Sequence, residues 1–117
     1  MQYITNTKVN SNVSFGAMHP SSKAYDFIVK RAGNPEKLGL IGNIMYSMYN
    51  SKVDANIYVS SDLIPRLVAS IDEYNGHGYK MKESLWDRLF HSPAKFLSKV
   101  KAEMRHIERK NAKSISK

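Results

Sequence analysis

Cysteine is absent from this chain of 117 residues. Its absence excludes disulfide bonds, thiolate nucleophiles and cysteine-ligated zinc sites, and it fits a cytoplasmic protein. Long apolar runs are absent as well, because the longest uncharged apolar stretch, residues 38–51, contains two glycines and is shorter than the ~20 residues of a membrane-spanning helix. The first 20 residues also lack the basic start and continuous apolar run of a signal peptide. We therefore expect no membrane association.

Acidic residues are scarce relative to basic ones: ten Asp and Glu stand against 18 Lys and Arg, for a formal net charge of +8. The excess is concentrated near the C-terminus, where residues 93–117 carry eight basic and two acidic side chains. Summed like charge of this kind attracts polyanions and anionic surfaces. The charge distribution therefore points to an electrostatic partner of this segment and says little about the fold.

The remaining composition is that of a globular protein, with 42% hydrophobic and 24% charged residues, and the length matches a single domain. Capping signals locate several helices. Ser21 or Ser22 precedes an amphipathic stretch that Gly33 ends. The pairs Asn34-Pro35 and Ser92-Pro93 each combine an N-cap residue with proline at the first helical position. These signals predict helix starts near residues 23, 35 and 93.

Two further helices are expected from apolar stripes, over residues 63–74 and 83–91. The first stripe would bury Ile64, Leu67, Val68 and Ile71, and the second would bury Leu85, Trp86, Leu89 and Phe90. Strands are expected at residues 55–59 and 79–82, and alternating apolar residues favour a hairpin within residues 1–20. The prediction is a helix-dominated α+β domain, in which about five helices cover a small, three-stranded antiparallel sheet. Residues 1–92 would form its body, and residues 93–117 a basic helix with a frayed end.

The expected helix over residues 35–49 is unusual, because no charge occurs between Lys37 and Lys52. One interpretation is a central core helix. The alternative is a protein interface that contains Met45, Met48 and Tyr49, since methionine adapts to irregular surfaces and tyrosine is enriched at binding hot spots. A second copy of the chain is a further candidate to bury this uncharged face, so self-association stays open. The interior glycines at positions 39 and 42 would suit either a ragged helix start or a close approach of another chain segment.

The last helix divides into two faces. Leu97, Val100, Met104 and Ile107 form one narrow apolar stripe with Phe96 beside it, and Glu103 and Glu108 lie at its boundaries. The opposite face is cationic. Its candidate nucleic-acid contacts are Lys95, Lys99, Arg105, Arg109, Lys110 and Lys113. Such a ridge fits the phosphates of a nucleic acid, an acidic groove on a partner protein, an anionic membrane surface, or simply a solvated helix face. Lysine-rich ridges bind phosphate without reading bases, so no sequence specificity is expected.

Catalytic signatures are weak. The four histidines are scattered, no metal-ligand spacing occurs, and no glycine-rich phosphate loop is present, so no metal and no cofactor are expected. A metal-free nuclease that uses His19 or His77 beside basic side chains stays an alternative, because such sites converge from distant positions.

We therefore expect a small, non-catalytic intracellular binding protein whose basic C-terminal helix contacts nucleic acid. The competing hypothesis is a protein-binding modulator. Such a protein would be an inhibitor or adaptor of a nucleic-acid-processing enzyme, of the accessory kind that phages and mobile elements encode.

Overall fold

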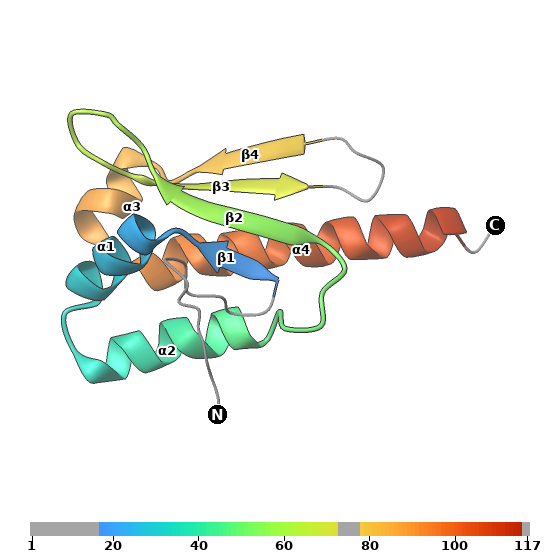
Figure 1. Cartoon of the computed structure of the whole chain (residues 1–117), viewed down its shortest axis with the longest axis horizontal. Helices are drawn as coiled ribbons and strands as arrows, with labels where there is room; N and C mark the ends of the chain where they lie inside the picture. Colours follow the sequence, from blue (N-terminus) through green and yellow to red (C-terminus); the bar gives the residue numbers. More distant parts are fainter. Residues whose placement is uncertain (1–16, 73–77, 116–117) are drawn as a thin grey trace, which may run out of the picture.

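The computed structural model describes the backbone of residues 17–72 and 78–115, and the side chains of these residues up to Lys110. The described elements follow the order β1 (Met18–Pro20), α1 (Ser22–Ala32), α2 (Pro35–Tyr46), β2 (Asp54–Val59), β3 (Leu67–Asp72), β4 (Gly78–Lys82), α3 (Leu85–Phe90) and α4 (Pro93–Ile115) (Figure 1). The α+β class is confirmed. The sheet, however, has four strands of mixed direction, and the described residues form four helices instead of five.

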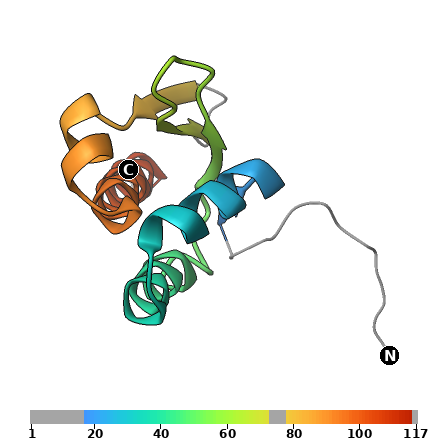
Figure 2. The same cartoon turned by 90° about the vertical axis from the view of Figure 1, so that its left-hand side faces the viewer.

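The strands lie in the order β1-β2-β3-β4. Strand β1 pairs in parallel with β2, with His19 beside Asn56, whereas β2, β3 and β4 form an antiparallel meander. The helices lie together on one side of this sheet (Figure 2). The core side chains of the sheet therefore come from alternate strand positions, among them Ala55, Ile57 and Ile71.

Strand β3 corrects the predicted helix over residues 63–74. Leu67, Val68, Ala69 and Ile71 are all buried because β3 is a central strand, hydrogen-bonded on both edges. A short apolar run of this kind is compatible with an amphipathic helix and with a buried strand, so its periodicity alone does not distinguish the two structures. The expected strand at residues 79–82 is confirmed as the edge strand β4.

The predicted N-terminal hairpin falls mainly on residues 1–16, which lie outside the described residues. The described part of that region contributes only β1, and its parallel pairing with β2 differs from the antiparallel sheet that was expected. The parallel pairing is possible because α1 and α2 form the long crossover that parallel neighbours need.

The capping predictions for α1 and α2 are confirmed. The Ser21 hydroxyl accepts a hydrogen bond from the Ala24 N–H (3.1 Å), and the Asn34 side chain accepts one from the Lys37 N–H (2.8 Å). Gly33 ends α1 with φ of 81°, a left-handed conformation that glycine adopts without strain. Helix α2 starts cleanly at Pro35. Apart from the backbone of the helix itself, no atom of the described residues lies within 4 Å of a Cβ atom added to Gly39 or Gly42. Neither a ragged start nor a close approach therefore explains these two glycines.

The apolar stripe of α4 is confirmed as its docking face, since Phe96, Leu97, Val100, Met104 and Ile107 are all buried. Met45 and Met48 belong to the same core cluster. The α2 segment is thus largely the core helix of the first interpretation, and these two methionines are not accessible to a partner.

Candidate functional site

Helix α3 has its faces reversed relative to the usual amphipathic arrangement. Asp87 is only 3% exposed and points into the protein, whereas Leu85, Trp86, Leu89 and Phe90 are 45%, 66%, 53% and 63% exposed. The expectation that these four side chains are buried is therefore wrong. Large apolar groups on a surface are informative when they gather on one element, since single exposed ones are common.

A buried ion pair holds the polar face of α3. The two terminal nitrogens of Arg31, on α1, donate to the two carboxylate oxygens of Glu83 at 2.7 and 2.9 Å. Both side chains are nearly inaccessible, at 9% and 0% exposure. The same guanidinium donates to the carbonyl oxygens of Asp87, Arg88 and His91, which lie in the last turn of α3 and its C-cap. Arg31 therefore binds both ends of the segment that carries the exposed apolar residues.

Further contacts tie this segment to the sheet and to the β2–β3 connection. Glu83 accepts a hydrogen bond from the Leu67 N–H at 3.2 Å, and Arg88 Nε donates to the Pro65 carbonyl at 2.7 Å. The guanidinium groups of Arg31 and Arg88 both lie over the Phe27 ring, 5.4 and 5.1 Å from its centroid. The orientation of α3 is thus determined by polar contacts, which leave its apolar face outward.

Two of the predicted nucleic-acid contacts take part in this arrangement. Lys99 Nζ donates to Asp87 Oδ2 at 2.7 Å, and Lys95 Nζ lies 3.9 Å from Asp87 Oδ1. The hydrogen bond from Lys99, with the nearby charges of Lys99, Lys95 and His91, lowers the pKa of Asp87 below its ordinary value although burial opposes the shift. Lys95 and Lys99 therefore neutralise a buried carboxylate, and their charge is not fully available to a polyanion.

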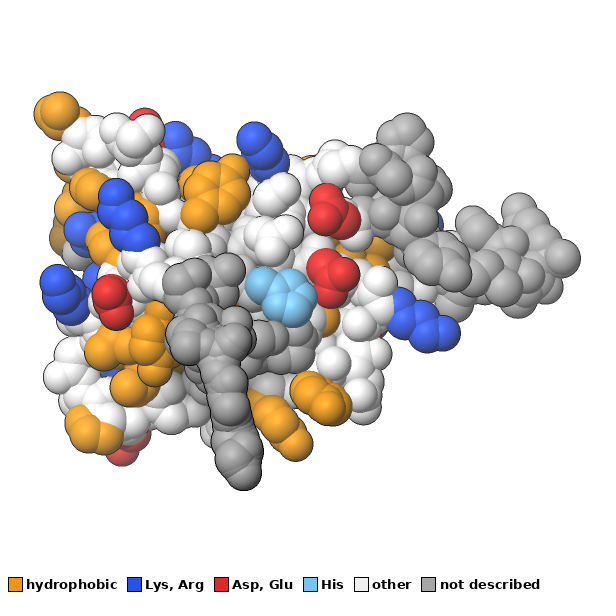
Figure 3. Space-filling view, viewed as in Figure 1, with side chains coloured by type: hydrophobic (Ala, Val, Ile, Leu, Met, Phe, Trp, Pro, Cys, Tyr) orange, Lys and Arg blue, Asp and Glu red, His pale blue; other side chains and the backbone are white. Residues whose placement is uncertain are grey.

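We define the α3 end surface by its exposed apolar residues, which come from α3 and from the β2–β3 connection: Leu63, Ile64, Leu85, Trp86, Leu89 and Phe90. Leu63 is completely exposed, and the Trp86 and Phe90 rings lie 4.5 Å apart in a tilted arrangement. In Figure 3 hydrophobic and basic side chains intermingle at the left-hand end of the molecule, where Figure 1 places α3 and this connection.

The β2–β3 connection is held in place by Asp62. Hydrogen bonds from Lys82, Ser60 and Arg66 lower the pKa of Asp62 to about 2, so this carboxylate stays ionised at all ordinary pH values. The apolar residues Leu63 and Ile64 follow directly, so the clamp fixes the segment that presents them next to α3.

The other predicted contacts lie farther along α4. Arg105 donates to Glu108 and to the Ser47 carbonyl, both at 3.0 Å, and its side chain remains 44% exposed. Burial would raise the pKa of Glu108, but hydrogen bonds from Ser51 and Arg105 outweigh it and lower the pKa. Arg109 and Lys110 are exposed, and the side chain of Lys113 lies outside the described residues.

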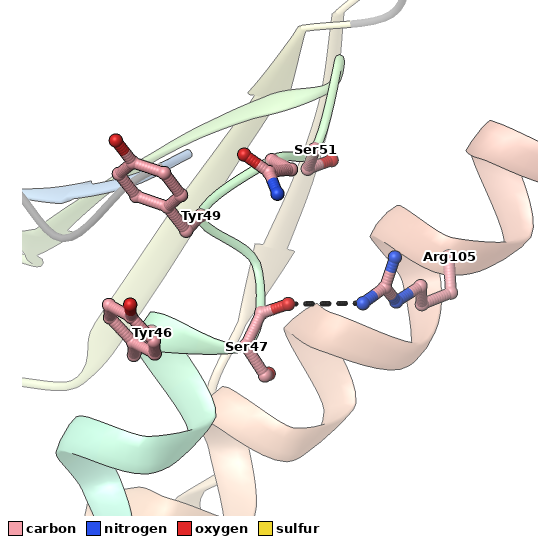
Figure 4. Close-up of a pocket in the computed structure, with 6 residues that line it drawn as sticks. Tyr46, Ser47, Tyr49, Ser51 and Arg105 are labelled. Carbon is pink, nitrogen blue, oxygen red and sulfur yellow. Dashed lines mark hydrogen bonds between the residues drawn. The ribbon is translucent and has the colours of Figure 1, made fainter.

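A second candidate surface lies where α2 ends. Of the predicted interface residues only Tyr49 is exposed (61%), and it forms a stacked pair with Tyr46 (71% exposed), with ring centroids 5.9 Å apart. The two rings border a depression of about 450 Å³ that Arg105 lines from the other side (Figure 4). The remaining lining residues are Ser47, Asn50 and Ser51.

Catalytic chemistry finds little support among the described residues. His19 Nε2 lies 3.3 Å from Asp54 Oδ1, and Asp72 is the direct cross-strand neighbour of Asp54. Of the two histidines in the nuclease hypothesis, only His19 lies within the described residues. The carboxylates of Asp54 and Asp72 would repel a phosphodiester bound at His19. Within the described part of the chain, no group of three His, Asp or Glu side chains is placed to hold a metal ion. No helix there has both the length and the apolar character to cross a membrane.

No protein-family model, no curated protein and no solved structure matches this chain. Its function therefore has to be inferred from its own surfaces. The sequence carries one signal for the α3 end surface. Leu85-Trp86 and Leu89-Phe90 share one face of a helix and Asp87-Arg88 lie on the other, so burial of the charged face leaves the four apolar side chains exposed. Nothing in the sequence connects Arg31 with Glu83, which is 52 residues away.

Proposed function

We propose that this protein is a non-catalytic protein-binding module that docks on its partner through the α3 end surface. The single observation that carries the proposal is the reversed orientation of α3: its charged residues point inward and its four large apolar side chains point to solvent. Tryptophan and aromatic anchors with aliphatic neighbours are typical of the energetic centre of protein interfaces.

The surface is large enough to contribute substantially to binding. Trp86 and Phe90 expose about two thirds of their area, so covering both would remove on the order of 250 Å² from water, given side chains of about 150–250 Å². At about 25 cal/mol per Å² this is about 6 kcal/mol, which is comparable to the lower range of the cost of association, about 4–15 kcal/mol. Leu63, Leu85 and Leu89 must therefore contribute as well.

The charge around the surface indicates the chemistry of the partner. Six cations border the surface or belong to the contacts that orient it, namely Arg31, Arg66, Lys82, Arg88, Lys95 and Lys99. The nearby carboxylates of Asp62, Glu83 and Asp87 pair with several of these cations and offset part of their charge, so a smaller net positive charge remains around the surface. A partner with an apolar groove and carboxylates at its rim is complementary. A second copy of this chain is disfavoured, because a two-fold interface would bring like charges together.

The rigidity of the surface supports the same proposal. Helix α3 has six residues, too few to be stable alone, and its position depends on the ion pair of Arg31 with Glu83. A preorganised surface loses little conformational entropy on binding, which favours affinity. A helix that presents residues i, i+1, i+4 and i+5 outward forms a ridge suited to a partner's groove.

The test uses the wild-type protein and the Leu89→Ser/Phe90→Ser variant as baits to capture binding partners from lysates of cells that naturally carry the gene for this protein. The matched control is Leu40→Ser, which removes an equally exposed leucine (54%) from α2. We expect a partner that the wild type and the control retain and that the double variant loses. Added salt should weaken the capture, because the rim is basic. Exposed substitutions of this kind change stability by roughly 0.5 kcal/mol or less, so folding is preserved.

Trp86 supplies a direct readout, since it is the only tryptophan of the chain. Binding of the purified partner should shift its emission to the blue and protect it from acrylamide quenching. Three outcomes would contradict the proposal: a partner that binds the double variant unchanged, self-association that the double variant abolishes, or cosedimentation with phosphatidylserine vesicles that it abolishes. The last two would assign the surface to a second copy of the chain or to a membrane.

A further inference from the structure

The stacked tyrosines at the end of α2 form a fixed aromatic platform. Met48, which lies between the two tyrosines in the sequence, is fully buried. The chain turns tightly there, with hydrogen bonds from the Tyr49 N–H to the Tyr46 carbonyl (2.9 Å) and from the Ser51 N–H to the Met48 carbonyl (3.0 Å). Because Met48 anchors the turn in the core, both tyrosine rings point to solvent. Their planes differ by only 20°. The ring faces are thus presented to solvent in a nearly parallel, preorganised arrangement.

Arg105 is held on the opposite side of the depression (Figure 4). One terminal nitrogen donates to the Ser47 carbonyl and the other to Glu108, which in turn accepts a hydrogen bond from the Ser51 hydroxyl at 2.7 Å. These two contacts engage two of the five N–H groups of a guanidinium. With 44% of the side chain exposed, the guanidinium is both positioned and accessible to an anion beside the rings.

Basic residues continue along α4 on both sides of Arg105. Lys101 and Arg109 lie one helical turn before and after it, on the same side of the helix. Arg109 is exposed, as are Lys95 and Lys99 near the start of α4, but the last two lie beside the buried carboxylate of Asp87. Three basic residues of α4, Lys101, Arg105 and Arg109, therefore share the side of the helix that lines the depression beside the two tyrosines.

We propose that the surface formed by Tyr46, Tyr49, Asn50, Lys101, Arg105 and Arg109 binds single-stranded nucleic acid. Unpaired bases would stack on the tyrosine rings, and the neighbouring phosphates would contact the cations of α4. Stacking on aromatic rings combined with a basic track is the mode by which proteins bind single strands with little sequence preference. A duplex keeps its bases stacked on each other and offers this surface only phosphates. The rings therefore predict a preference for single strands that the basic helix alone would not have.

This inference goes beyond the proposed protein docking and does not depend on it. The α3 end surface and the tyrosine surface involve different side chains. The first is carried by α3 and the β2–β3 connection, and the second by the end of α2, the turn that follows it and the middle of α4 (Figure 1). A Leu89→Ser/Phe90→Ser variant should bind nucleic acid as the wild type does. Failure of one proposal is thereby distinguishable from failure of the other.

The experiment measures fluorescence anisotropy with four labelled probes of about 15 nucleotides, a length in the range of known single-strand sites. The probes are oligothymidine, oligouridine, a DNA duplex and an abasic DNA strand of equal length. For the wild-type protein near 50 mM salt, we expect oligothymidine to bind about tenfold or more tightly than the abasic strand or the duplex, since each stacked base contributes to affinity. Oligouridine shows whether RNA binds in the same way.

Variants then separate stacking from charge. Tyr46→Ala/Tyr49→Ala should lose about tenfold or more affinity for oligothymidine but little for the abasic strand, whereas Tyr46→Phe/Tyr49→Phe should bind normally because it keeps the rings. Arg105→Gln/Arg109→Gln should weaken binding to every probe and reduce the salt slope by about 1 per residue. Tyr79→Ala is the matched control, since Tyr79 is an exposed tyrosine of the edge strand β4.

The proposal is overturned by any of three results. These are no binding of oligothymidine near 50 mM salt, equal affinity for oligothymidine and the abasic strand, or normal binding by Tyr46→Ala/Tyr49→Ala. Circular dichroism of each variant checks the fold. If the alanine pair unfolds the protein, the comparison of the thymidine and abasic probes on the wild type still decides the question.

Discussion

Replacement of Glu83 by alanine should destabilise this protein more than any exposed substitution. The change would leave the guanidinium of Arg31, 9% exposed, without its carboxylate partner, and would also remove the acceptor of the Leu67 N–H in the central strand β3. Loss of one member of a buried ion pair typically costs about 3–5 kcal/mol. Total stabilities of small domains are about 5–15 kcal/mol, so this single change could remove a large part of the folding free energy.

The measurement is urea denaturation followed by two signals. Far-ultraviolet circular dichroism reports the whole fold, whereas the fluorescence of Trp86, the only tryptophan, reports α3. In the wild type the two transitions should coincide. In Glu83→Ala we expect a loss of about 3–5 kcal/mol, with the Trp86 transition at the same or lower urea concentration than the dichroism transition. Asp62→Asn serves as the control, because the ion pairs of Asp62 are exposed and should matter far less.

A double-mutant cycle with Arg31→Met makes the reasoning quantitative. Arg31→Met leaves the Glu83 carboxylate buried and removes the donor from two carbonyls of α3 and from that of its C-cap, His91. Arg31→Met/Glu83→Ala removes both charges, so it should be less destabilised than the sum of the single changes by about 2–3 kcal/mol. A loss below about 1 kcal/mol for Glu83→Ala, or strictly additive effects in the cycle, would refute the view that this ion pair determines the position of α3.

Two more predictions concern helix α2 and Asp87. Gly39→Ala and Gly42→Ala should each raise the free energy of unfolding by about 0.5–1 kcal/mol, because both glycines lie inside a helix and an added Cβ would meet no atom of another described segment within 4 Å. Urea denaturation checks this, and a loss of stability would contradict it. Lys99→Met should raise the pKa of Asp87 toward its ordinary value of 3.8. Because the folded-state pKa of Asp87 is lowered, its stabilisation is present above that ordinary value and is lost as the pH falls through the lower folded-state pKa. Unfolding free energies from pH 7 down to about pH 2 should therefore show a deficit of the variant that closes at the acidic end, and a deficit independent of pH would contradict the assignment.

Elements whose signals are local were predicted well. The serine and asparagine caps of α1 and α2, the glycine that ends α1 and the proline that opens α4 each act within a few residues of themselves. The docking stripe of α4 was also correct, because a 23-residue helix repeats its pattern often enough to define one face. The concentration of basic residues near the C-terminus is likewise a property of the sequence itself.

Elements that depend on distant contacts were predicted poorly. Leu67 to Ile71 form a strand because β2 and β4 lie on either side of them, and this pairing outweighs the helical spacing of the same residues. The apolar side chains of α3 were expected in the core. They are exposed because Arg31 and Lys99, from two other helices, bind the opposite face of α3.

The same distinction between local and distant contacts applies to the candidate sites. The basic and apolar faces of α4 can be read from the sequence, as can the methionines and tyrosines near the end of α2. The fold is needed to see that Met45 and Met48 are buried while Tyr46 and Tyr49 face solvent beside Arg105, and that Lys95 and Lys99 lie beside Asp87. The physical reason is that caps and helical faces depend on neighbours within one or two turns. The exposure of a face or the availability of a charge depends on what the folded chain brings against it from tens of residues away.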